Sequence, residues 1–93
     1  MENFVTISIE VLIMKVKNMV VKRILDLCGE RGITLNELAN RSGVTPSTVY
    51  SIMDQDRRNI SIVTIKTICD GFEITLGEFF STEEFDNLPQ EIE

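Results

Sequence analysis

The 93-residue sequence contains no histidine and no tryptophan, and it has only two cysteines, two prolines and one tyrosine. Without histidine it lacks the most common general acid–base group and the most common metal ligand. Cys28 and Cys69 do not have the spacing of a metal site, so we expect two free thiols in the core rather than a disulfide or a zinc site. A glycine-rich phosphate loop and a spaced pair of carboxylates are missing too. We therefore expect a protein that is not an enzyme and that binds no metal or cofactor.

Long apolar runs are also missing from the sequence. No segment reaches the roughly 18 consecutive apolar residues of a membrane span. The apolar N-terminal stretch has neither the basic start nor the small-residue cleavage site of a signal peptide. These absences predict a cytoplasmic protein without a membrane segment. A chain of this length forms one small domain, whose single core is marginal enough for oligomerisation to help.

Basic residues are scarce relative to acidic residues, and the formal net charge is −6. The imbalance lies at the C-terminal end, because residues 72–93 hold seven acidic residues and no basic residue. Residues 19–71 hold seven basic and six acidic residues, so the middle of the chain is nearly neutral. An acidic chain of this kind can still carry a local basic patch, and its acidic end can engage a basic protein partner.

The most informative segment is residues 34–54, TLNELANRSGVTPSTVYSIMD. Thr34 and Glu37 form a capping box at the start of one short helix, and Gly43 ends this helix because glycine tolerates a positive φ. Thr45 is expected to cap a second helix that has proline in its first turn. Two helices with so short a connection form a helix-turn-helix, whose second helix can enter a DNA major groove.

The same segment carries a recognisable motif formed by Leu38-Ala39, Gly43-Val44, Val49-Tyr50 and Ile52. A loop and the stretch ISIVTIKTICDGFEITLGEFF follow in register. This pattern resembles the Cro/repressor (XRE-type) helix-turn-helix domains of bacteria and phages, over about residues 19–81. The resemblance implies a mainly α, five-helix repressor-like domain that binds operator DNA as a homodimer. Leu35 departs from the pattern, since the family often has at this position a glutamine that contacts a phosphate.

The resemblance also implies that the outer side of the second motif helix faces base edges. The candidate base-reading residues are Thr45, Ser47, Thr48, Tyr50 and Ser51. Hydroxyl groups both donate and accept hydrogen bonds, so they discriminate among bases less sharply than the arginine, asparagine and glutamine that this face lacks. A solvated helix face is the alternative for the serines, and a partly buried ring is the alternative for the tyrosine.

Residues around the motif are candidates for contacts with DNA phosphates. They are Thr34, Leu35, Asn36, Arg41, Arg57, Arg58 and Asn59. The first three begin the first motif helix, where backbone N–H groups and the helix dipole favour an anion. The resemblance also implies that the loop of residues 55–59 lies against the DNA backbone. Asp54 and Asp56 reduce this attraction, and solubility is the alternative role of the loop arginines.

The N-terminal residues 4–16, FVTISIEVLIMKV, lie outside the resemblance. Their period-two alternation and many β-branched residues favour a β-strand extension. A helical alternative exists because Val5, Ile9, Leu12 and Val16 share one helical face, but the β-branched density argues against it. We expect residues 1–18 to be a strand that serves as a dimerisation arm, and residues 19–93 to form the helix-turn-helix domain with an acidic C-terminal helix.

Two alternatives concern the role of this extension. The strand is expected to pair with the same strand of a second subunit, because its backbone needs a partner that the helical domain does not offer. A rival interface lies near the C-terminus, at Phe79, Phe80, Phe85 and Leu88. The extension is also compatible with a translation start at Met14 or Met19 instead of Met1.

Further helices are expected on both sides of the motif. Residues 19–31 form a first helix capped by Asn18, with Val21, Ile24, Leu25 and Cys28 facing inward. Ser61 caps a helix whose buried residues are Ile62, Ile65, Ile68, Cys69 and Phe72. Capping boxes at Thr75/Glu78 and Ser81/Glu84 begin two short helices near the C-terminus.

Three functional hypotheses follow from the sequence. The first is a sequence-specific regulator that binds double-stranded DNA as a homodimer. The second is a DNA-binding antitoxin or accessory protein whose acidic C-terminal region engages a basic protein. The third is a helix-turn-helix module used for protein interaction, which would require Asp54 and Asp56 to neutralise the loop arginines.

Overall fold

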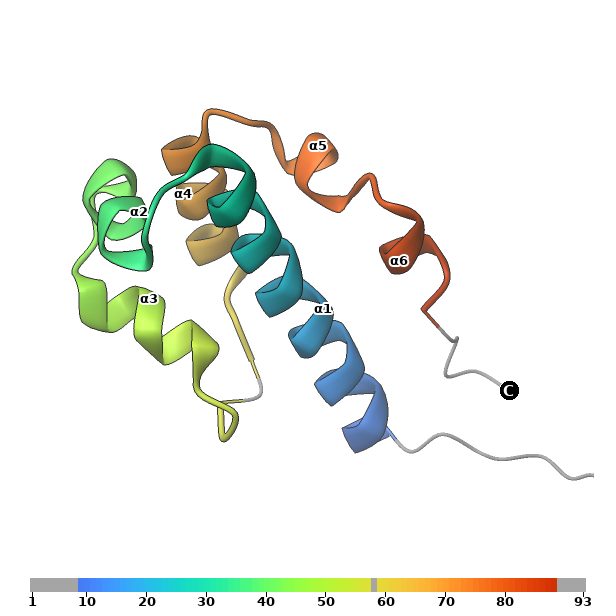
Figure 1. Cartoon of the computed structure of the whole chain (residues 1–93). Coiled ribbons are helices and arrows are strands. Elements are labelled where there is room, and N and C mark those ends of the chain that lie inside the picture. The colour runs from blue at the N-terminus through green and yellow to red at the C-terminus, as the bar shows by residue number, and fades with distance from the viewer. Residues whose placement is uncertain (1–8, 58, 89–93) are drawn as a thin grey trace, which may run out of the picture.

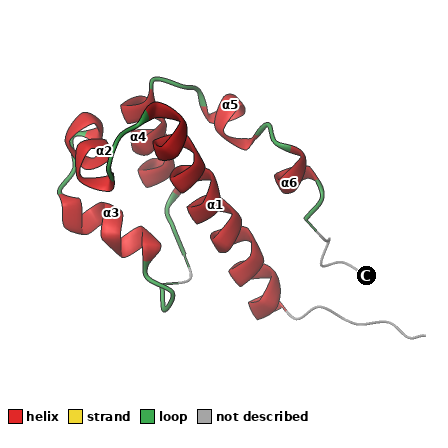
Figure 2. Ribbon diagram, viewed as in Figure 1, coloured by secondary structure: helices red, strands yellow, loops and turns green. Residues whose placement is uncertain are grey.

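The computed structural model describes the backbone of residues 9–57 and 59–88, and the side chains of these ranges from residue 15 onward. Within these ranges the chain is helical and contains no strand (Figure 2). The six helices are α1 (Ile9–Arg31), α2 (Leu35–Ser42), α3 (Pro46–Met53), α4 (Ile62–Phe72), α5 (Leu76–Phe80) and α6 (Glu83–Asp86). Helices α2 and α3 lie on one side of the long helix α1, and α5 and α6 lie on the other (Figure 1).

The predicted N-terminal strand is wrong where the structure describes it, because residues 9–16 form the first two turns of α1. Residues 4–8 of the expected strand lie outside the described residues. The β-branched side chains disfavour a helix by only a few tenths of a kcal/mol each, roughly. Extending an existing helix avoids the cost of nucleation, so an extension to a stable helix tolerates them. The helical alternative is therefore the correct interpretation of residues 9–16.

The start and the buried face of α1 also differ from the prediction. Asn18 does not cap a helix but lies exposed within α1, which runs without interruption across residues 18 and 19. Val20 and Leu27 are buried beside the expected Ile24 and Cys28, whereas Leu25 is 47% exposed. The inward stripe of α1 is thus rotated slightly from the predicted stripe. Helices α5 and α6 lie on the side of α1 that faces away from α2 and α3 (Figure 1).

The core is built mainly from α1, α2, α3 and α4. The buried apolar residues are Val20, Ile24, Leu27, Cys28, Leu38, Ala39, Val49, Ile52, Ile65, Ile68, Cys69, Phe72 and Phe79. Cys28 and Cys69 are buried free thiols, as predicted. Ile62 was expected in the core but is 60% exposed, because it occupies the first turn of α4, where the helix leaves the core.

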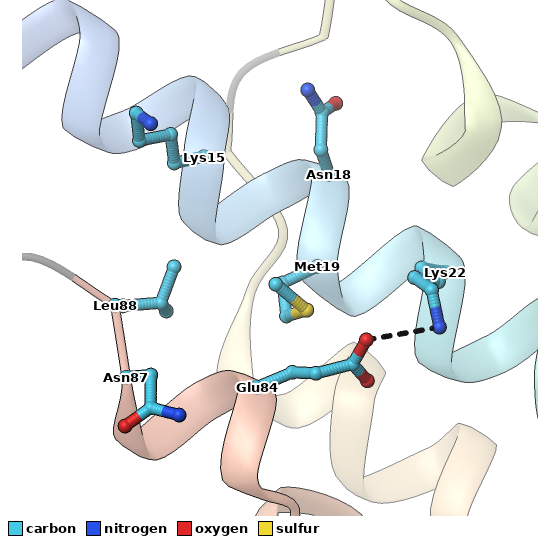
Figure 3. Close-up of a pocket in the computed structure, with 7 residues that line it drawn as sticks. All are labelled: Lys15, Asn18, Met19, Lys22, Glu84, Asn87 and Leu88. Atoms are coloured by element: carbon cyan, nitrogen blue, oxygen red, sulfur yellow. Dashed lines mark ion pairs between the residues drawn. The ribbon is translucent and has the colours of Figure 1, made fainter.

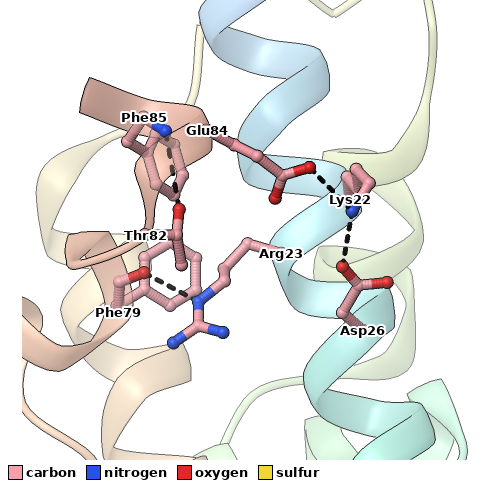
Figure 4. A network of polar contacts seen from close by, with 7 residues as sticks. All are labelled: Lys22, Arg23, Asp26, Phe79, Thr82, Glu84 and Phe85. Atoms are coloured by element: carbon pink, nitrogen blue, oxygen red, sulfur yellow. Dashed lines mark hydrogen bonds and ion pairs between the residues drawn. The ribbon is translucent and has the colours of Figure 1, made fainter. Parts of the chain in front are cut away.

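Arg23 of α1 fixes the C-terminal helices. Its Nε donates to the carbonyl of Phe79 at 2.8 Å (Figure 4). Its Nη2 donates to the carbonyl of Glu78 at 2.9 Å, so Arg23 satisfies two carbonyl groups near the end of α5. The predicted Thr75/Glu78 capping box is confirmed at the start of α5. Helix α6 begins one residue later than predicted, because Thr82 rather than Ser81 is its N-cap.

Among the described residues, no helix combines the length and the apolar character needed to cross a membrane.

Candidate nucleic-acid interface

The α2–α3 unit has the expected helix-turn-helix geometry. Thr34 Oγ1 accepts from the Glu37 N–H at 3.1 Å, and the Glu37 carboxylate accepts from the Thr34 N–H at 2.9 Å, so the predicted capping box is complete. Gly43 ends α2 with φ 73°, a left-handed conformation that a side chain would strain. These local features set the turn between the two helices, and the buried residues Leu38 and Val49 lock their packing.

The outer face of α3 carries the hydroxyl groups that the sequence singled out. Ser47 is exposed, Thr48 and Ser51 are half-buried, and Tyr50 is 50% exposed. Half of the tyrosine side chain is therefore available for contact. Thr45 is the N-cap residue by position, but its hydroxyl makes no cap hydrogen bond, contrary to the prediction.

The Thr45 hydroxyl instead lies 3.0 Å from Ser47 Oγ and 3.1 Å from Thr48 Oγ1. Three hydroxyl groups thus form a connected cluster at the start of α3. Such a cluster can exchange donor and acceptor roles when a ligand approaches, because each hydroxyl hydrogen rotates freely.

The structure brings Arg57 to the same face. Its Nη1 donates to Ser51 Oγ at 2.6 Å and its Nε donates to the Asn59 carbonyl at 3.3 Å. In the described ranges 9–57 and 59–88, no ion pair joins Arg57 to an acidic side chain. The Asp54 carboxylate accepts instead from the Asp56 N–H at 3.0 Å. Asp54 and Asp56 therefore do not pair with this arginine.

A polar hollow of about 310 Å³ separates α3 from the start of α4. The residues that line it are Ser47, Thr48, Ser51, Ile52, Arg57, Ile60, Ser61 and Thr64. Ser61 and Thr64 were not predicted as part of this surface, although Ser61 was correctly identified as a cap. Its Oγ accepts from the Thr64 N–H at 3.0 Å. The capping pattern placed Ser61 on a helix start, but only the fold shows that this start faces α3.

The remaining candidate residues lie around α2 and in the loop after α3. Thr34, Asn36, Arg41 and Asn59 are exposed, and Leu35 is half-buried against the core. Thr34 uses its hydroxyl in the capping box, so its side-chain acceptor is already engaged. Arg58 lies outside the described residues.

Lys17 is a residue that the sequence did not indicate. It is only 3% exposed, and its Nζ donates to the carbonyl of Asp54, the C-cap residue of α3. The N-terminal half of α1 thereby contacts the end of α3 directly. The helical alternative for residues 4–16 was the one signal that could have extended α1 far enough to place this lysine.

A second hollow, of about 510 Å³, lies between α1 and α6 on the other side of the molecule (Figure 3). It is lined by Lys15, Asn18, Met19, Lys22, Glu84, Asn87 and Leu88. Lys22 pairs with Glu84 at 3.1 Å and with Asp26 at 2.8 Å. Hydrogen bonds to Asp26 first, and then to Glu84, raise the pKa of Lys22 above its ordinary value. The lining has no nucleophile poised beside a base, and the described residues hold no cluster of metal ligands.

Comparison with known proteins identifies the family. Residues 23–84 match the Cro/C1-type HTH DNA-binding domain, over more than half of the chain. The chain belongs to this family. The matched range contains the α2–α3 unit, the Arg57 loop and α4, so the hydroxyl-bearing face of α3 is the outer face of a Cro/C1-type second motif helix.

A solved structure supports the fold independently. The crystal structure of the prophage Lp1 protein 11 is similar to this chain with a TM-score of 0.69 and 22% sequence identity, over 76% of this chain and 93% of that chain. At this identity the likeness concerns the fold. No curated protein matches the chain.

Proposed function

We propose that this Cro/C1-type domain is a sequence-specific transcriptional regulator that inserts α3 into the major groove of double-stranded DNA. The observation that carries this proposal is the exposed polar face of α3, held at a helix-turn-helix in a chain of this family. Its base-reading residues are Thr45, Ser47, Thr48, Tyr50 and Ser51, whose hydroxyls meet base edges while the tyrosine ring offers an apolar contact to a thymine methyl.

Phosphate contacts flank this face. The exposed Arg41 at the end of α2 and the exposed Asn59 in the loop supply polar side chains, and Arg58 belongs to the same loop. The start of α2 adds backbone N–H groups near Leu35 and Asn36, beside Thr34, without requiring a glutamine. These contacts fix the orientation of α3 on the duplex and carry little sequence information.

The charge of the molecule fits this proposal when it is divided by region. Seven of the acidic residues lie in residues 72–93, and the part of this segment that the structure describes lies mostly in α5 and α6, across α1 from α3 (Figure 1). Repulsion from these acids is therefore weakened by distance and by salt. A regulator of this kind acts on DNA, so we expect it in the cytoplasm.

A homodimer is the expected binding form, because paired half-sites roughly one DNA turn apart suit a two-fold symmetric protein. The rival aromatic interface is partly used within the subunit. The Phe80 ring lies 4.9 Å from both Phe79 and Phe85, and Phe79 is fully buried. Sedimentation of the full chain tests this expectation, and a monomer at micromolar concentration both alone and on DNA would contradict it.

The third hypothesis, a protein-interaction module without DNA affinity, predicted that Asp54 and Asp56 neutralise the loop arginines. Arg57 contacts Ser51 instead, and Asp54 accepts from the Asp56 N–H, which argues against this neutralisation for Arg57. The second hypothesis, a DNA-binding antitoxin or accessory protein, keeps the same α3 surface and adds a basic protein partner for the acidic C-terminal region. Selection of bound fragments from random duplex DNA tests the shared claim. Recovery of one enriched motif supports it, and recovery of no enriched motif contradicts it.

A further inference from the structure

The recognition helix itself is short of discriminating side chains. The eight residues of α3, Pro46–Met53, include no charged residue and no amide side chain. Guanine is most often read by a bidentate arginine, and a hydroxyl gives weaker discrimination. A regulator that relies on α3 therefore gains specificity if a neighbouring segment brings a stronger donor to the same face.

Arg57 meets this requirement because it is already held at α3. Its guanidinium donates to Ser51 Oγ at 2.6 Å, and both residues line the hollow that also contains Ser47 and Thr48. This hydrogen bond holds the guanidinium against the outer face of α3. The observed contact sets its direction toward the groove-facing side.

The loop that carries Arg57 is anchored at its start. The Arg57 N–H donates to the Asp54 carbonyl at 3.1 Å, and the buried Lys17 ammonium donates to the same carbonyl. The Asp56 N–H donates to the Asp54 carboxylate at 3.0 Å. These bonds tie the backbone of Arg57 to the C-terminus of α3. A side chain held this way loses less conformational entropy on binding.

The donors of this pair remain available for a ligand. A guanidinium has five N–H donors and no acceptor, and Arg57 uses one donor on Nε and one on Nη1 in the described contacts. Both terminal nitrogens therefore keep an N–H. Ser51 accepts from Arg57, so its own O–H is free to donate. Arg57 presents hydrogen-bond donors only, and the O–H of Ser51 adds a further donor, which suits the two acceptors of guanine, O6 and N7.

We infer that Arg57 is a base-reading residue that binds a guanine in the major groove, and that Ser51 positions it. The inference rests on the proposed DNA-binding function and revises the sequence-based expectation that Arg57 contacts phosphate. Sequence specificity then comes partly from the loop after the recognition helix. Phosphate is the competing acceptor, and the two roles differ in what a base change does to affinity.

The test uses the full chain and an operator selected from random duplex DNA. Each guanine of one half-site is replaced in turn by 7-deazaguanine, which lacks the N7 acceptor, and affinity is measured by fluorescence anisotropy. For the protein without a substitution, we expect one guanine whose replacement weakens binding about tenfold. This loss lies in the lower part of the range for a bidentate contact. The same replacement should leave the affinity of the Arg57→Ala protein unchanged.

Arg57→Lys separates the two roles further. Lysine keeps the charge but not the planar fork, so it should reduce the penalty at that guanine while keeping much of the salt dependence. Ser51→Ala should reduce the penalty in the unmodified protein and change nothing at that guanine in the Arg57→Ala background. Circular dichroism and thermal unfolding test whether each variant is folded. Because Arg57 is exposed, we expect its replacement to leave the fold intact.

Arg41→Ala is the matched control, since it removes an equally exposed arginine from α2. It should weaken all duplexes alike and retain every 7-deazaguanine penalty. If Arg57→Ala behaves in the same way as Arg41→Ala, Arg57 contacts phosphate and the inference is overturned while the proposed function stands. If selection yields no preferred duplex, the proposed function fails and the inference fails with it.

Discussion

Two threonines at helix starts differ by one hydrogen bond, which makes them a matched pair for stability. Thr34 Oγ1 accepts from the Glu37 N–H, whereas Thr45 makes no side-chain cap bond to α3. Thr34→Ala should therefore lower the free energy of unfolding by about 1 kcal/mol. Thr45→Ala should cost clearly less. Urea denaturation measures both, and equal losses would mean that the capping bond of Thr34 contributes nothing.

Gly71 is required by close packing between α4 and α2. A Cβ at this position would lie 2.1 Å from Ser42 Oγ and 3.1 Å from the Ser42 backbone nitrogen. Gly71→Ala should destabilise the protein by roughly 1–3 kcal/mol, because the two helices must move apart. Gly29→Ala is the control and should stabilise the protein. No atom lies within 4 Å of a Cβ at this position, and alanine favours the helix over glycine by up to about 1 kcal/mol. Thermal unfolding that ranks the two variants the other way would contradict the packing.

The two cysteines make stability sensitive to alkaline pH. Burial raises the pKa of the Cys28 thiol, and burial followed by the Asp70 charge raises that of Cys69, above the ordinary 9.0. The unfolded chain loses these protons first as the pH rises, so their contribution to stability is complete below pH 9 and declines above it. Unfolding followed between about pH 7 and about pH 10 should show this decline, and it should be smaller in Cys69→Ala. A decline of equal size in that variant would show that other groups cause it.

At the level of single residues, the sequence predicted what local chemistry decides. The capping boxes at Thr34 and Thr75 and the left-handed Gly43 depend on neighbours a few positions away. Exposure of Leu25 and Ile62 depends on which other element covers them, and no local pattern contains that information. The contact between Arg57 and Ser51 also requires the loop to turn back over α3, so the sequence assigned the two residues to separate roles.

At the level of elements, α1 is the main correction and also the source of a new contact. Its 23 residues extend about 34 Å at the standard rise, and its N-terminal half lies between α6 and the end of α3. Taken alone, the β-branched composition of this segment favours a strand. In the folded chain, the first turns of α1 continue a helix that the core already stabilises, and Lys17 then meets the Asp54 carbonyl.

Removal of the Lys17 side chain should therefore weaken the link between α1 and α3. Lys17→Ala loses a charged hydrogen bond and the packing of a buried stem, so we expect a loss of roughly 1–2 kcal/mol in the free energy of unfolding. Lys15→Ala removes an exposed lysine two residues away and should change stability by less than about 0.5 kcal/mol. Hydrogen exchange of the loop after α3 adds a local readout. Unchanged exchange in Lys17→Ala would contradict the anchoring role.

At the level of the whole molecule, the proposed DNA-binding surface and the acidic C-terminal helices lie on two sides of α1. Helix α3 lies on one side and the acidic helices α5 and α6 lie on the other (Figure 1). The hydroxyl groups of α3 and Arg57 line the same hollow beside α3. The motif and its spacing predicted the helix-turn-helix on the α3 side of α1, because a helix-turn-helix is a local arrangement. The hollow that Ser61 and Thr64 complete is not local, since it joins α3 to a helix that begins after the loop.

The central claim is that this surface recognises particular DNA sequences, and a competition experiment tests it most directly. A labelled duplex that carries the selected motif is bound by the full chain and displaced by the same duplex or by its scrambled counterpart, from about 50 mM to about 200 mM salt. We predict that the selected duplex competes at least about a thousandfold better at near-physiological salt, and that binding of both weakens steeply as salt rises. Equal competition by the two duplexes at every salt concentration, or no binding of either, would contradict the account.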